Sequence, residues 1–307
     1  GDLVLRDLDA ALIAAGSNGQ SFSGEISGAG SFTKTGSADF LVSGSNAFRQ
    51  SGDTRIKGGI LNLENTTQEI QSLVIDGPGK VLGGDLVAAA LDNSGEISIN
   101  SLAGTSADNT FVNVYGSIKI TSNANIDFKG GNDTFLTNAN VSGSGIIDGG
   151  AGVIDTIKFG TARTCDLEDL DDPCKDVPSF KAAKIDNFEF AEQVSGDWDY
   201  DGNYKEAGVE TMTLKGGRML ILDNEHATFK NFVMDGKDAQ LVASLESKNS
   251  APLVADSFDY KAGSLAIMAS DQTNPEGTYM VIDAPAASQG EMNQLAANTM
   301  LFYDENT

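Results

Sequence analysis

The sequence is poor in cysteine, proline, histidine and tryptophan, and it lacks long apolar runs. Its 307 residues include 2 Cys, 6 Pro, 1 His and 1 Trp. So few prolines exclude a collagen-like chain and a proline-rich linker. No stretch approaches the ~18 consecutive apolar residues of a transmembrane helix, so we expect no helical membrane span. The chain begins with Gly-Asp and shows no signal peptide, which indicates a processed or excised piece of a longer protein.

Basic residues are also scarce. The chain has 20 Lys and Arg against 44 Asp and Glu, which gives a net charge of −24. A chain of this charge repels phosphate backbones, so we expect no nucleic-acid partner. The two cysteines, Cys165 and Cys174, lie close together in an acidic, loop-like stretch without a nearby histidine. In a reducing compartment they are two thiols, but in a secreted protein they form a small disulfide, which we predict here.

Glycine, in contrast, is abundant, and 25 of the 35 glycines lie between residues 16 and 160. Short apolar alternations with a period of two, such as 96–99 and 117–120, alternate with turn residues and indicate many short strands. A sandwich, a barrel or a solenoid satisfies this pattern, but tight hairpin dipeptides are too few for an antiparallel ladder. The Asp-Thr pairs at 133 and 155 lie 22 residues apart, about one coil of a solenoid. We therefore predict an all-β, right-handed parallel β-helix, with helical periodicity only at 8–15 and weakly at 291–297.

A more specific pattern covers residues 22–63. Glycines alternate with apolar residues up to Lys34, a Ser-Gly-x-Asn turn ends at Asn46, and a Gly-x-Thr-x-Ile-x-x-Gly-x-Leu run begins at Gly52. The pattern resembles the passenger-associated transport repeat of bacterial autotransporters, with small departures at residues 40, 42 and 49–51. The resemblance implies two solenoid coils with glycines at the corners. The residues expected to point inward are Phe22, Ile26, Phe32, Phe40, Val42, Ile56, Leu61 and Leu63.

The last third of the chain is similar to the final coils of an autotransporter passenger, particularly at 263–267 and 277–284. The resemblance implies a secreted or cell-surface bacterial protein, attached to the outer membrane or released, whose precursor carries a membrane barrel. It also implies an adhesin that binds a host-surface or bacterial-surface ligand through an elongated, polar rod. One alternative is a structural or filament subunit that self-associates through open strand edges. Another is a β-helix enzyme that acts on polysaccharides.

The glycine rhythm breaks between residues 161 and 210, which hold 14 acidic and 5 basic residues. We therefore divide the chain into a β-helix with the transport repeat (1–160), an acidic disulfide-stapled excursion (161–210) and C-terminal coils (211–307). The excursion either covers a coil edge or contacts a partner, since loops on rigid scaffolds often carry binding residues. The candidate partner-binding residues are Asp169, Asp171, Asp172, Trp198 and Tyr200. For the two aromatic residues, Trp198 and Tyr200, the alternative is that they fill the core.

Residues 197–203 match the first half of a calcium loop, in which side-chain oxygens alternate along the chain before a glycine. The candidate Ca²⁺ ligands are Asp197, Asp199, Asp201 and Asn203, and we expect no other cofactor. The match fails at the twelfth position, where Gly208 stands in place of glutamate, so a simple acidic turn is the alternative. We expect no catalysis, because the only histidine, His226, has no nucleophilic serine motif to serve.

Overall fold

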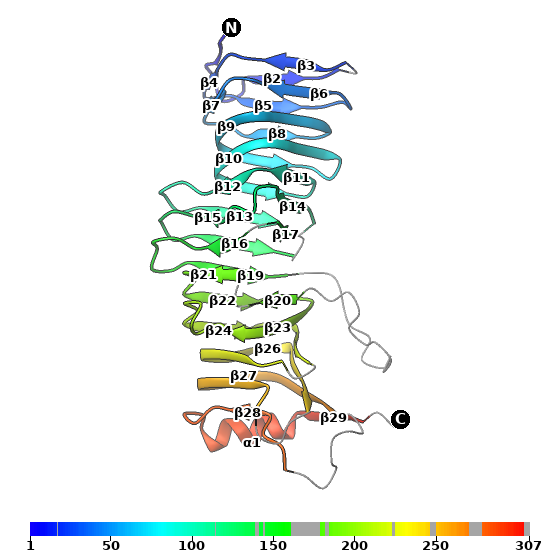
Figure 1. Ribbon diagram of the computed structural model, residues 1–307, viewed down its shortest axis with the longest axis vertical. Helices are drawn as coiled ribbons and strands as arrows, with labels where there is room; N and C mark the ends of the chain where they lie inside the picture. Colours follow the sequence, from blue (N-terminus) through cyan, green and yellow to red (C-terminus); the bar gives the residue numbers. More distant parts are fainter. Residues whose placement is uncertain are drawn as a thin grey trace. The chain divides into compact units, whose positions relative to one another are not determined.

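The computed structural model describes residues 1–16, 18–113, 115–138, 141–143, 145–160, 179–181, 184–222, 225–245, 250–269 and 278–303. The chain divides into two compact units, unit 1 (Gly1–Asp155) and unit 2 (Thr156–Thr307). The described residues are almost entirely β and form parallel stacked coils, about 11 turns in the two units together. Figure 1 shows each unit as a stack of strands. The predicted all-β parallel solenoid is thereby confirmed, with fewer and larger coils than a strict 20-residue repeat would give.

Unit 1 contains the first eighteen strands, and all its described strand pairs are parallel. Strands β1, β4 and β7 form a separate three-stranded sheet. The strands are β1 (Leu3–Leu5), β2 (Ala11–Ala14), β3 (Gln20–Phe22), β4 (Ile26–Gly28), β5 (Ser31–Lys34), β6 (Asp39–Val42), β7 (Phe48–Gln50), β8 (Thr54–Ile56), β9 (Gly59–Ile75), β10 (Gly79–Asn93), β11 (Glu96–Ile99), β12 (Ser101–Ala103), β13 (Thr110–Asn113), β14 (Ser117–Ile120), β15 (Ile126–Asp127), β16 (Thr134–Thr137), β17 (Val141–Ser142) and β18 (Ile147–Asp148).

Unit 2 contains the remaining strands, also in parallel pairs, and the one helix of the described chain. The two longest strands of this unit, β26 and β27, pair along most of their length, with a register shift between Asp235 and Gln240. The elements are β19 (Thr156–Phe159), β20 (Ser179–Lys181), β21 (Ile185–Asp186), β22 (Phe190–Gln193), β23 (Asp197–Asn203), β24 (Thr211–Leu214), β25 (Gly217–Ile221), β26 (Ala227–Leu245), β27 (Leu253–Ala269), β28 (Ile282–Asp283), α1 (Gln289–Ala297) and β29 (Thr299–Tyr303).

The core of each unit consists of the inward residues of successive strands, stacked one coil above the next. Each strand buries alternate side chains, because a period of two places neighbours on opposite faces. Seven of the eight residues expected to point inward in the transport-repeat region are buried, and Phe22 is half-buried. Aromatic rings continue the stacking: the ring centroids of Phe32 and Phe48 are 5.1 Å apart, and those of Tyr204 and Phe229 are 4.9 Å apart.

Helix α1 confirms the weak helical periodicity at residues 291–297. Ser288 is its N-cap and forms a capping box with Glu291, in which each side chain accepts a hydrogen bond from the other residue's backbone N–H. The stronger periodicity at 8–15 does not produce a helix, because residues 11–14 form strand β2 and pair with β5. No helix in the described part of the chain is long and apolar enough to cross a membrane.

Part of the acidic segment belongs to the coils, which its composition did not indicate. Strand β22 pairs with β19 and β24, and β23 pairs with β25 and β26, all in parallel register. Residues 190–203 therefore belong to regular coils. The reason is that their acidic residues occupy mostly outward positions, while Ala191, Trp198 and Tyr200 fill the core. The amino-acid composition counts the acidic residues but does not show that outward and inward positions alternate along these strands.

Candidate functional site

The residues predicted to wrap a calcium ion form strand β23 instead. A strand is extended, so alternate residues share one face but lie roughly 6.6 Å apart along it, and four of them cannot close around one ion. The Asp197 carboxylate is 2% exposed and receives two hydrogen bonds from the Arg218 guanidinium, from Nε at 3.0 Å and from an Nη at 2.6 Å. The structure thus gives Asp197 an arginine partner from the next coil and does not join it with Asp199, Asp201 and Asn203. Among the described residues, no group of three or more His, Cys, Asp or Glu residues is placed to hold a metal ion.

The aromatic candidates for partner binding lie in the core. Trp198 and Tyr200 are both 0% exposed, and their rings pack on Phe159 at centroid distances of 5.0 and 5.9 Å. Burial raises the pKa of the Tyr200 hydroxyl well above its usual value. Core filling, the alternative reading of these residues, therefore holds, and neither ring is available to a partner.

The other candidates of the acidic excursion fall in a part of the chain that the structure leaves undescribed. Asp169, Asp171 and Asp172 lie there, and so do both cysteines of the predicted disulfide, Cys165 and Cys174. Partner binding by the three acids and the disulfide therefore stay predictions from sequence.

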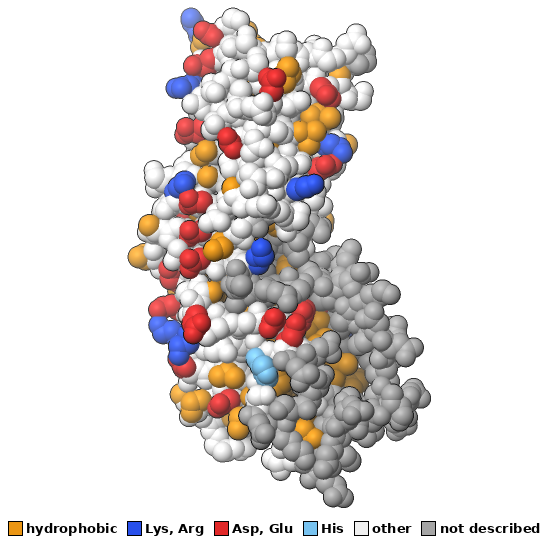
Figure 2. Space-filling view, viewed as in Figure 1, with side chains coloured by type: hydrophobic (Ala, Val, Ile, Leu, Met, Phe, Trp, Pro, Cys, Tyr) orange, Lys and Arg blue, Asp and Glu red, His pale blue; other side chains and the backbone are white. Residues whose placement is uncertain are grey.

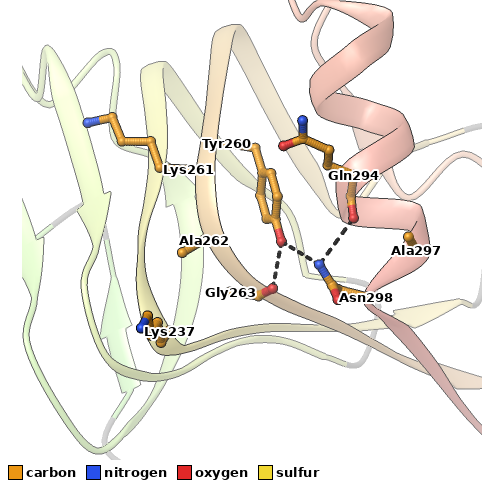
Figure 3. Close-up of a pocket in the computed structure, with 8 residues that line it drawn as sticks. All are labelled: Lys237, Tyr260, Lys261, Ala262, Gly263, Gln294, Ala297 and Asn298. Atoms are coloured by element: carbon orange, nitrogen blue, oxygen red, sulfur yellow. Dashed lines mark hydrogen bonds between the residues drawn. The ribbon is translucent and has the colours of Figure 1, made fainter.

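Unit 2 has a candidate ligand groove of about 420 Å³ between β26, β27 and the C-terminal end of α1 (Figure 3). The register shift between β26 and β27 lies beside this groove, since Lys237 falls between Asp235 and Gln240. Gly263 sits at the base with a φ of +122°, and a Cβ there would lie only 2.8 Å from the Ala239 carbonyl oxygen. Side chains from the strands and from the helix face the groove together. Its polar lining residues are Lys237, Tyr260, Lys261, Gln294 and Asn298.

A short hydrogen-bond chain fixes the wall of this groove (Figure 3). The Tyr260 hydroxyl donates to the Gly263 carbonyl at 2.8 Å and accepts from Asn298 Nδ2 at 2.9 Å. Asn298 Nδ2 also donates to the Gln294 carbonyl at 3.2 Å. These bonds tie the last turn of α1 to β27. Because these bonds use the Asn298 and Tyr260 donors, the polar groups left for a ligand include Asn298 Oδ1, the Gln294 side chain and the exposed Lys237 ammonium.

Among the described residues, ten basic side chains form ion pairs with acids, most of them on a neighbouring coil. Glu192 lies between two lysines; burial pushes the pKa of its carboxyl upward, but hydrogen bonds from Lys215 and Lys158 outweigh burial and leave it below its usual value. In Figure 2, acidic and basic side chains lie next to each other along the visible face. The outer surface of the described coils is therefore polar and acidic, with few uncompensated cations. Further pairs are Arg55–Asp76, Lys80–Glu96, Lys205–Asp256, Lys230–Glu210 and Lys261–Asp235.

His226 is placed as a surface residue that binds the backbone. Its ring Nδ1 lies 3.0 Å from the Ala251 carbonyl oxygen, and the residue is exposed. Within the described residues no hydrogen bond joins His226 to a serine or to a carboxylate, which a Ser-His-Asp mechanism requires.

Sequence reasoning missed the groove beside α1 altogether. Lys237 and Asn298 are far apart in the chain, and only the docking of α1 on β27 brings them together. The available signal was the Ser-x-x-Glu capping box at residues 288–291, which marks the start of a helix at the end of a strand-rich chain.

The fold and its groove define the chain as a parallel β-solenoid with a polar outer surface. Comparisons with protein families, with curated proteins and with solved structures found no match for it.

Proposed function

We propose that this chain is a cell-surface passenger of the autotransporter type and acts as an adhesin. The observation that carries the proposal is the fit between the transport-repeat pattern and the coils that it forms. The pattern's inward positions are buried, as described above. Its glycines lie at corners and have a positive φ, which favours glycine: +100° at Gly28, +72° at Gly36 and +66° at Gly59. Asn46 also adopts a positive φ of 53° at its turn.

The lysine of the pattern has a structural role of its own. Lys34 is 2% exposed, and its Nζ donates to the carbonyl oxygens of Thr35 at 2.5 Å, Gly36 at 3.1 Å and Gly58 at 3.2 Å. An ammonium has three hydrogens, so these bonds use all of them. The lysine thereby closes one corner and joins it to the next coil. Each unusual residue of the pattern has a physical reason in a stacked-coil fold, which supports the family resemblance.

Adhesion fits a solenoid whose outward side chains are polar and repeated along the coils. No single contact needs to be strong, because several modest contacts made at once multiply in affinity. The acidic surface disfavours anionic partners at long range and favours neutral or cationic surfaces. The ligand of such an adhesin is accordingly a neutral or basic component of a cell surface.

A bead assay tests the adhesin proposal directly. Beads coated with the 307-residue chain are counted on cultured epithelial cells and on bacterial cells, beside beads coated with albumin and beads coated with the heat-denatured chain. We expect several-fold more native-coated beads on at least one cell type. Equal counts for native-coated and albumin-coated beads on all cells would overturn the proposal.

Self-association is the second candidate, and open strand edges favour it. Among the described strands, β1 pairs only with β4, β2 only with β5 and β3 only with β6. Apolar side chains are exposed near these edges: Val4 is 61%, Leu8 81% and Ile13 61% exposed. An unpaired, apolar strand edge is a template for another strand.

A further inference from the structure

Phe190 on β22 is an aromatic side chain that points out of its coil. It is 36% exposed, whereas the next residue, Ala191, is 2% exposed and fills the core. Phe188, two residues earlier, is 0% exposed, so of these two rings only Phe190 reaches the surface. A single exposed apolar side chain is ordinary on a protein surface, so the residues around Phe190 decide whether it has a role.

The parallel register of the strands fixes these neighbours. Phe190 lies opposite Thr156 of β19 on one side and opposite Thr211 of β24 on the other. Thr211 lies opposite Asn231 of β26, and Asn231 lies opposite Ser257 of β27. Neighbouring strands of a sheet are about 4.8 Å apart, so these five residues form one column across the coils of unit 2. We call it the Phe190 column.

All five side chains of the Phe190 column lie on the outer face of the sheet. Each of them is at least partly exposed, and the residue that follows each one is buried, as the alternation along a strand requires. The column therefore presents its groups to the same side, where one ligand can contact several of them. The buried residues that follow are Ile157, Ala191, Met212, Phe232 and Phe258.

The hydroxyls on both sides of Phe190 are available to a ligand. No hydrogen bond within the described residues uses the Thr156 hydroxyl. The Thr211 hydroxyl accepts from Asn231 Nδ2 at 3.4 Å, which leaves its own hydrogen for another acceptor. Asn231 is held in turn, because its Oδ1 accepts from the Ser257 hydroxyl at 2.7 Å. An exposed ring thus lies between two hydroxyls, one of them oriented by a chain of hydrogen bonds.

The charges beside the column are paired with one another. Glu192, two residues further along β22 and on the same face, lies 3.1 Å from Lys158 and 2.5 Å from Lys215. Glu210 pairs with Lys230 at 2.6 Å. An anionic ligand would have to compete with these carboxylates for the lysines, so the surroundings of the column favour a neutral ligand.

A sugar ring matches an exposed aromatic ring between hydroxyls. The face of an aromatic ring carries negative partial charge, so the weakly positive C–H groups of a sugar can lie on it. The hydroxyls at the edge of the sugar can then donate to and accept from the threonines. A peptide strand, in contrast, finds no open edge here, because β22 pairs with β19 on one side and with β24 on the other.

We propose that the Phe190 column binds a neutral oligosaccharide that lies across the coils. One sugar ring lies on Phe190 and exchanges hydrogen bonds with Thr156 and Thr211, and further sugar units extend toward Asn231 and Ser257. The inference deepens the proposed adhesin function by naming the class of ligand, and it rests on that function only for the biological role of binding.

Saturation-transfer NMR on the 307-residue chain tests the Phe190 column with defined probes. The neutral probes are cellotetraose, maltotetraose, xylotetraose and chitotetraose, each beside its monosaccharide. Tetragalacturonic acid and a Val-Thr tetrapeptide represent the acidic and peptide classes. We expect saturable signal from at least one neutral tetrasaccharide, with tighter binding than its monosaccharide, because several contacts act at once. Signal from none of the neutral probes, or from the acid or the peptide alone, would sink the inference.

Outward residues of the column supply variants that keep the core intact. Phe190→Ala should weaken binding of the active tetrasaccharide about tenfold, while Phe190→Tyr keeps a ring and should stay within about twofold of the wild type. Thr211→Val removes a hydroxyl at nearly constant volume and should weaken binding several-fold. Val194→Ala is the matched control, since Val194 is 38% exposed and lies just beyond the end of β22. Unchanged binding in both Phe190→Ala and Thr211→Val would overturn the assignment to this column.

The same variants separate this inference from the adhesin proposal. If native-coated beads bind cells and Phe190→Ala beads bind equally well, the column is not the adhesive site while adhesion itself stands. If a neutral oligosaccharide binds through Phe190 but no bead binds any cell, the assignment to the column stands and the adhesin proposal fails.

Discussion

At the scale of single residues, Lys34 is the side chain on which a coil corner depends. Lys34→Met keeps much of the side-chain volume but removes the donor for three carbonyl oxygens of a buried corner. We expect the free energy of unfolding of unit 1 to fall by about 3 kcal/mol. Urea denaturation followed by circular dichroism measures it. Lys57→Met, at an exposed lysine nearby, is the control and should change stability by less than ~0.5 kcal/mol; equal effects would show that the corner does not depend on the ammonium.

Asp133 makes unit 1 sensitive to pH. It is 0% exposed; its Oδ1 accepts from the Asn109 backbone and side chain, and its own N–H donates to Asp155 Oδ1 at 2.7 Å. Burial raises the pKa of the Asp133 carboxyl to about 6, despite the hydrogen bonds from Asn109, and the Asp155 and Asp108 charges add to the rise.

The direction in which stability changes with pH depends on whether the folded or the unfolded state binds the proton at Asp133 more tightly. Between the unfolded pKa of 3.8 and the folded value of about 6, the folded state holds more protons at Asp133, so its stability falls as pH rises through this window and levels off above it. Melting temperatures from about pH 4 to about pH 7 should therefore decline in the wild type, and Asp133→Asn should flatten that slope. A slope that survives in Asp133→Asn would assign the pH dependence to other groups.

At the scale of elements, the pair of Asp197 on β23 and Arg218 on β25 fastens two coils. Removing one partner of a buried ion pair is costly, so Arg218→Met should lower the stability of unit 2 by roughly 3 kcal/mol. Asp197→Leu combined with Arg218→Met should recover part of this loss, because an apolar pair leaves no charge buried. Chemical denaturation of the single and double variants measures both effects. A double variant as unstable as the sum of the singles would show that the two side chains are not coupled.

Individual strands and corners of this solenoid could be predicted from the sequence. The period-two burial of β5 and β6 and the corners at Gly28 and Gly36 could be predicted, because both depend only on residues close together in the sequence. The 22-residue spacing of the two Asp-Thr pairs was also informative: Asp133 and Asp155 do lie in contact.

The residues that contact each other on different coils could not be predicted from the sequence, because the number of residues per coil varies. Hydrogen-bonded partners on neighbouring coils lie as little as 16 residues apart, as in Lys80 and Glu96, and as much as 35 apart, as in Phe159 and Val194. The arginine partner of Asp197 follows from this variable register. For the same reason the calcium pattern at 197–203 misled: a motif in sequence does not fix whether its residues turn or extend.

At the scale of the whole molecule, electrostatics and exposed strand edges act in opposite directions. A net charge of −24 keeps copies of the chain apart, while the edges of β1, β2 and β3 attract strands. Salt screens the repulsion over about 10 Å at 0.1 M and leaves apolar contacts intact. Association of the chain should therefore grow with both protein concentration and salt.

Multi-angle light scattering measures this balance. We expect the average mass of the 307-residue chain to rise with concentration at high salt, and Val4→Lys with Ile13→Lys to suppress the rise, since a charge on an edge strand opposes edge-to-edge pairing. Val153→Lys is the matched control, because Val153 is an equally apolar residue of unit 1, 73% exposed, outside these strands. A mass that stays monomeric at every concentration and salt would remove self-association as a function. A rise that the control suppresses as strongly as the edge variant would assign it to general charge repulsion instead.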